Sequence, residues 1–177
     1  MQSKHPKSMA QFASPLDRNV SKKYFYYNNI TMNKIGFNFL LFIIIYVYYV
    51  LIDGAMIFLY TGKAFGSMIK NIQKGEPMKT RMIPGIICFF VLAFGYTYFI
   101  LPKIRDEAIV IDSLKYGAVF GLVVYAVYDL TNLATFGKYA TSTAIIDILW
   151  GGILGFLVSM LGAFTRRRFG KLQEANF

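Results

Sequence analysis

Residues 35–60 read IGFNFLLFIIIYVYYVLIDGAMIFLY, and this apolar stretch decides the fold of the chain. At a rise of about 1.5 Å per residue, a helix of this length extends about 39 Å, which exceeds the roughly 30 Å hydrocarbon core of a bilayer. Its one charged residue is Asp53. The stretch is too long for the apolar segment of a signal peptide, so it predicts a transmembrane helix.

Three more apolar stretches follow, over about residues 82–101, 113–134 and 141–164. Pro84 lies near the first turn of the second stretch and Pro102 lies just after its end, where a proline costs a helix little. The whole chain is 56% apolar and 18% aromatic, with a mean hydropathy of +0.47. These features predict an all-α integral membrane four-helix bundle.

The link between the first two spans carries an amphipathic pattern. Apolar residues recur at helical spacing, with lysines between them, at Phe65, Met68, Ile69 and Ile72. This pattern predicts a short interfacial helix whose apolar stripe faces the membrane.

The basic residues predict the topology. Of the Lys and Arg residues, 13 lie in the amino-terminal segment, the second link together with Lys115 at the start of the third span, and the carboxyl end, against 6 in the first and third links. The positive-inside rule therefore places both termini in the cytoplasm. We expect a basic, flexible cytoplasmic tail over residues 1–34, a four-span transmembrane domain over 35–165 and a second basic cytoplasmic tail over 166–177.

The net charge of +10 does not indicate nucleic-acid binding, because the basic residues lie in short runs beside apolar stretches. We expect membrane lipid, not nucleic acid, as the partner of these runs. Cys88 is the single cysteine and His5 the single histidine, which argues against disulfides, zinc sites and histidine-based catalysis. We therefore expect neither a metal nor a cofactor.

Three carboxyl groups lie within the apolar spans, at Asp53, Asp129 and Asp147. A charge in hydrocarbon costs at least a few kcal/mol, so each needs a partner or water. In an antiparallel bundle all three lie on the same side of the membrane, roughly 8 to 10 Å from the end of their span. The sequence therefore predicts that they converge near the third link.

The residues around these carboxyls continue the polar pattern. The third span carries a polar stripe at helical spacing, made of Tyr125, Tyr128, Asp129 and Asn132. Glycines four residues apart predict close packing of the third and fourth spans, at Gly117 and Gly121 and at Gly151 and Gly155. We predict a ligand or ion cluster of Asp53, Asp129, Asn132 and Asp147, with Tyr125, Tyr128, Thr131 and Trp150 in support.

The stretch YDLTNLAT at residues 128–135, followed by IDILWG at 146–151, resembles a family of small bacterial membrane proteins, domain of unknown function 2177. LIDGA at residues 51–55 resembles the first helix of that family. The similarity runs from about Ile35 to Ala163. It implies a four-helix fold and the same three aspartates, but no activity, and the long amino-terminal segment departs from the family pattern.

Three functions remain open. The first is a bundle that binds or translocates a proton, a cation or a small polar ligand at the aspartates; because four spans leave little room for a pore, transport would favour a homo-oligomer. The second is a membrane-embedded enzyme, or enzyme subunit, that modifies lipid with an aspartate as acid or base. The third is a scaffold whose basic ends bind anionic lipid. In the plainest interpretation, the aspartates only hydrogen-bond between helices.

Overall fold

The computed structural model describes the backbone of residues 15–79 and 81–174, and the side chains of residues 35–79 and 81–170. This part of the chain is helical and contains no β-strand, which confirms the all-α fold. Within it, four helical segments are long and apolar enough to cross a membrane: Ile35–Ile72, Met82–Lys103, Ile109–Thr135 and Thr141–Gly170. They correspond to the four predicted spans.

The chain divides into two units, Met1–Phe39 and Leu40–Phe177. In the first unit, helix α1 (Pro15–Met56) begins well before the predicted start of the first span. Residues 1–14 of the expected amino-terminal tail lie outside the described residues. The flexibility and the cytoplasmic location of residues 1–34 stay predictions.

In the second unit, α1 continues through a π-helical turn, η2 (Ile57–Thr61), into helix α2 (Gly62–Ile72). Helix α2 is the helix expected in the first link. Part of its apolar stripe packs against the third link and the first turn of the fourth span. The contact of this stripe with the membrane stays a prediction. Met68 is buried in a cluster with Tyr139 and Ala144, and Phe65 packs against that cluster. The Met68 Sδ atom also accepts a hydrogen bond from a backbone N–H of the link, at 3.1 Å.

The second span begins with helix α3 (Met82–Gly95) and ends with a π-helical turn, η3 (Tyr96–Ile100), and a 3-10 turn, η4 (Leu101–Lys103). The third span comprises helix α4 (Ile109–Asp112), the π-helical turn η5 (Ser113–Ala118) and helix α5 (Val119–Thr135). Helix α6 (Thr141–Glu174) forms the fourth span and extends past residue 166, where a tail was expected. Residues 175–177 lie outside the described part of the chain.

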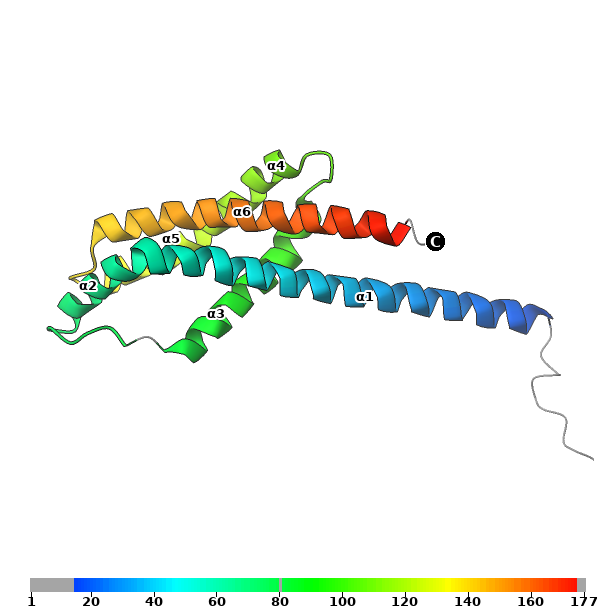
Figure 1. The fold of residues 1–177 in the computed structure, drawn as a ribbon, viewed down its shortest axis with the longest axis horizontal. Coiled ribbons are helices and arrows are strands. Elements are labelled where there is room, and N and C mark those ends of the chain that lie inside the picture. Colours follow the sequence, from blue (N-terminus) through cyan, green and yellow to red (C-terminus); the bar gives the residue numbers. More distant parts are fainter. Residues whose placement is uncertain (1–14, 80, 175–177) are drawn as a thin grey trace, which may run out of the picture. The chain divides into compact units, whose positions relative to one another are not determined.

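Helices α5 and α6 lie side by side, as Figure 1 shows for the yellow and orange ribbons. Glycines permit this approach. A Cβ atom at Gly121 would overlap the carbonyl oxygen of Gly151, and one at Gly155 would overlap the carbonyl oxygen of Gly117. The predicted close packing of the third and fourth spans is therefore confirmed.

Candidate functional site

The three intramembrane carboxyls come from three helices of the second unit: Asp53 from α1, Asp129 from α5 and Asp147 from α6. Asp129 is completely buried, Asp53 is 8% exposed, and Asp147 is half-buried. Burial of this kind is costly for a carboxylate, so the partners of each group decide what it can do.

Asp53 is held by the fourth span. The indole N–H of Trp150 donates a hydrogen bond of 2.7 Å to Oδ1 of Asp53. The hydroxyl of Tyr125 lies within hydrogen-bonding reach of the same carboxyl. Tyr125 can occupy this position because its ring lies against Gly151, where a Cβ atom would overlap it. Asp53 is therefore a hydrogen-bond acceptor shared between α5 and α6.

Asp129 and Asp147 form a carboxyl pair between α5 and α6. One oxygen of Asp129, Oδ1, accepts a hydrogen bond of 2.7 Å from the hydroxyl of Tyr139. The other, Oδ2, is buried and accepts no hydrogen bond from an N–H or a hydroxyl among the described residues. The carboxyl of Asp147 lies within hydrogen-bonding reach of Asp129. Since an ionised carboxylate only accepts hydrogen bonds, a bond between the two groups requires a proton on one of them.

No positive charge compensates this pair in the described part of the chain, where the ion pairs are Arg105 with Asp112 and Arg166 with Asp106. Tyr139 supplies a neutral donor in place of a cation. Burial, followed by the hydrogen bond to Asp129, raises the pKa of Tyr139 above its ordinary value of 10.0. Its hydroxyl therefore keeps its proton at neutral pH.

The other predicted site residues on α5 differ in their contact with the carboxyl pair and its partners. The Asn132 side chain is within hydrogen-bonding reach of Tyr128 and Tyr139, so it links the polar stripe of α5 to the third link. Tyr128 itself is 57% exposed. The structure does not bring Thr131 to the carboxyls, because its exposed hydroxyl donates to the backbone carbonyl of Val127 at 2.6 Å.

A cavity of about 210 Å³ lies between the end of the first span and the beginning of α6. Its lining combines four hydroxyl side chains with three apolar ones: Tyr60, Thr61, Ser142, Thr143, Ala64, Phe65 and Ile146. Thr143 precedes Asp147 by four residues, so the two lie on the same face of α6. The cavity therefore offers hydroxyl groups about one helical turn from the carboxyl pair.

A second polar cluster, at the other ends of the spans, was not predicted from the sequence. Asp112 is only 2% exposed and accepts three hydrogen bonds from Arg105, from its backbone N–H and from its guanidinium, at 2.8 to 3.0 Å. These bonds and the charge of Asp112 raise the pKa of Arg105. The sequence did contain a signal for this cluster: Asp112 stands directly before an apolar span, and a buried carboxylate needs a cation nearby.

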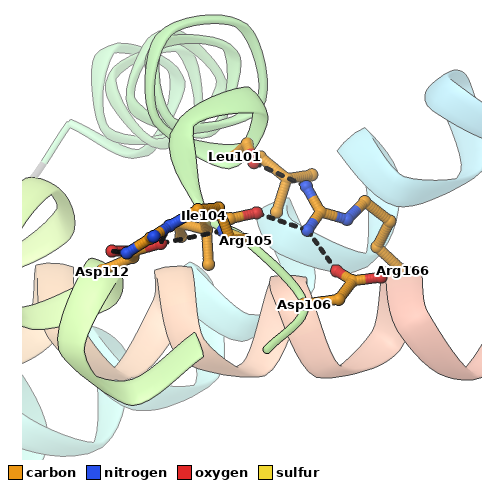
Figure 2. Close-up of polar contacts among 6 residues, drawn as sticks. All are labelled: Leu101, Ile104, Arg105, Asp106, Asp112 and Arg166. Atoms are coloured by element: carbon orange, nitrogen blue, oxygen red, sulfur yellow. Dashed lines mark hydrogen bonds and ion pairs between the residues drawn. The ribbon is translucent and has the colours of Figure 1, made fainter. Parts of the chain in front are cut away.

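Arg166 binds the same link from α6, as Figure 2 shows. Its guanidinium donates to the backbone carbonyls of Leu101 and Ile104 at 2.6 Å each and to Asp106 at 2.5 Å. The Leu101 carbonyl belongs to the last turn of the second span, where it also accepts the backbone N–H of Ile104, and Ile104 follows directly after that turn. Arg166 therefore fixes the second link to α6.

Comparison with known proteins gives one match. The model of a protein family described as "Predicted membrane protein (DUF2177)" matches residues 38–164, which is more than half of the chain. No curated protein and no solved structure matches the chain.

Proposed function

Since the chain belongs to the family of predicted membrane proteins DUF2177 and is an integral membrane protein, we propose that its Asp129–Asp147 pair is a proton-binding site within the bundle. The pair takes up one proton, shared between the two carboxyls. Loss of that proton leaves two buried negative charges side by side. Protonation therefore controls the charge between the end of α5 and the beginning of α6.

One observation carries this proposal: Oδ2 of Asp129 is buried and has no N–H or hydroxyl donor among the described residues, while the carboxyl groups of Asp129 and Asp147 interact with each other. An unsatisfied buried acceptor costs about 1–3 kcal/mol, and more if it is charged. A proton on the neighbouring carboxyl supplies the missing donor and removes one of the two charges.

The surroundings favour a proton over a metal ion. Among the described residues, no group of three His, Cys, Asp or Glu side chains is arranged to hold a metal. The cavity near the start of α6, about one helical turn from Asp147, has hydroxyl groups that can hydrogen-bond water or a small polar ligand. These hydroxyl groups support a role of the site in binding protons or small polar solutes.

Trp150 provides a built-in reporter for the test, because it is the only tryptophan and its indole is bound to Asp53. The chain is reconstituted in lipid nanodiscs and the indole fluorescence is followed as a function of pH. We expect a reversible transition, because the electric field at the indole changes as the pair gains or loses its proton. Asp129→Asn and Asp147→Asn should each abolish this transition or shift its midpoint.

The matched control is Glu107→Gln, which neutralises an exposed carboxylate in the second link. This variant should keep the wild-type fluorescence profile. If Asp129→Asn and Asp147→Asn both keep it as well, the pair does not bind a titrating proton and the proposal is wrong.

A further inference from the structure

We propose that Lys103, Lys115 and Tyr116 form a binding site for the phosphate headgroup of an anionic phospholipid. Lys103 ends the second span, and the other two residues lie in the η5 turn of the third. The ammonium groups of both lysines lie close to the Tyr116 ring, at 5.8 Å and 5.2 Å from its centroid. Two separate segments of the chain thus bring two cations to one aromatic ring.

The charges of this cluster are not matched within the described residues, where neither lysine forms an ion pair. The carboxylate of Asp112 interacts electrostatically with Lys115 but is already bound by three hydrogen bonds from Arg105. The exposed Glu107 lies close enough to influence Arg105 in turn. Two ammonium groups gathered at one ring repel each other, and a phosphate group bound between them would relieve that repulsion.

The surface around Lys115 favours a lipid over a soluble phosphate. Ile111 and Leu114 are 70% and 60% exposed. Ile111 precedes Lys115 by four residues, so the two share a face of the third span. Exposed apolar side chains in a membrane span contact acyl chains. A ligand at this position therefore needs a negative headgroup and an apolar body.

The depth of Lys115 also suits a headgroup. The residue lies six positions after the start of the span at Ile109, or about 9 Å along the helix. A lysine near the end of a span can direct its ammonium group toward the interface while its apolar stem stays in the membrane. Asp129 lies fourteen residues, or about 21 Å, further along. The lipid site is thus separate from the carboxyl pair and does not depend on its function.

The test measures lipid retention by the purified full-length chain. The protein is exchanged into detergent with phosphatidylglycerol or phosphatidylcholine, and the bound lipid is counted by native mass spectrometry. We expect Lys103→Gln and Lys115→Gln each to weaken phosphatidylglycerol binding about fivefold, and the double variant about 25-fold. Binding of phosphatidylcholine should not change.

Two controls accompany this comparison. Lys63→Gln with Lys70→Gln removes two exposed lysines from α2 and should leave phosphatidylglycerol binding as in the wild type. Lys103→Arg with Lys115→Arg keeps the charges and should retain most of the binding. If the double Gln variant does not fold, the two single variants decide the question.

Two results would overturn the proposal. One is a Gln variant that folds and retains phosphatidylglycerol as well as the wild type does. The other is displacement of the lipid by an equal concentration of inorganic phosphate, which would indicate a site for a soluble anion.

Discussion

The indole N–H of Trp150 donates a hydrogen bond of 2.7 Å to the carboxyl of Asp53, joining residues that are 97 positions apart in the chain. The bond links α6 to α1 within the membrane. It places the sole tryptophan of the chain in direct contact with one of the three intramembrane carboxyls.

Replacing Trp150 by Phe should destabilise the bundle, because Asp53 then loses a donor while remaining buried. We expect a loss of about 1–3 kcal/mol in the free energy of unfolding, measured by denaturant titration in detergent micelles. Adding Asp53→Asn completes a double-mutant cycle, and the two changes should be non-additive by at least about 0.5 kcal/mol. Additive effects would show that the bond contributes nothing.

Gly121→Ala should separate α5 from α6, because the added methyl group would overlap the carbonyl of Gly151. We expect a loss of about 1–3 kcal/mol in the same unfolding measurement. Gly85→Ala is the matched control, since a Cβ atom there meets nothing within 4 Å. Equal stability of the two variants would contradict the close packing of α5 on α6.

Arg166→Lys should destabilise the second link, although it keeps the positive charge. A single ammonium group cannot reproduce the geometry with which the guanidinium binds two carbonyls and Asp106. We expect faster proteolysis of the link between Lys103 and Ile109 in the detergent-solubilised protein. Arg168→Lys changes an exposed arginine of the same run and should not alter the proteolysis rate. An Arg166→Lys variant that is cut no faster than Arg168→Lys would argue against this role.

Tyr139→Phe should change the response of stability to alkaline pH. Burial and the bond to Asp129 raise the pKa of Tyr139 in the folded state, so above pH 10.0 the folded protein holds a proton that the unfolded chain releases. This contribution to stability is complete below pH 10.0 and decreases as the pH rises toward the folded-state pKa. Tyr139→Phe should therefore reduce the loss of stability above pH 10.0, relative to the exposed control Tyr98→Phe. Identical alkaline slopes in the two variants would contradict this assignment.

The positive-inside rule predicts that the third link faces outward and that the carboxyl end of α6 faces the cytoplasm. Lys138→Cys and Arg168→Cys, each made in a Cys88→Ala background, test this orientation. A membrane-impermeant thiol reagent added to intact cells should label position 138 and not position 168. The reverse labelling pattern would invert the topology.

The sequence predicted the four spans because long apolar segments have few alternatives to a transmembrane helix. It also predicted the close packing of the third and fourth spans, because small residues four positions apart let two helix backbones approach each other; the structure shows this approach between Gly121 and Gly151. The matched depth of Asp53, Asp129 and Asp147 predicted that the three carboxyls would converge, and in the structure Asp147 interacts with both of the others. Their role as a site stays a prediction. The sequence did not predict that Trp150 binds Asp53 or that Tyr139 binds Asp129. Predicting these contacts requires the rotation of each helix about its axis relative to its neighbours, which hydrophobic periodicity does not give.

Other features depended on contacts distant in sequence. The apolar stripe of α2 fits both a membrane surface and a protein surface, and the structure places Met68 against Tyr139 of the third link and Ala144 of α6. Arg166 belongs to a basic run that is typical of a span end, and its sequence alone does not distinguish a guanidinium that binds carbonyls from one that binds lipid.

Infrared spectroscopy tests the proton shared by Asp129 and Asp147 most directly, because a protonated carboxyl has a carbonyl stretch that an ionised one lacks. At neutral pH in nanodiscs, we expect the wild type to show this band and to shift it in heavy water. Asp129→Asn and Asp147→Asn should each remove or displace the band, and Glu107→Gln should keep it. A wild-type spectrum without a protonated carboxyl, or a band unchanged in both Asn variants, would contradict the account.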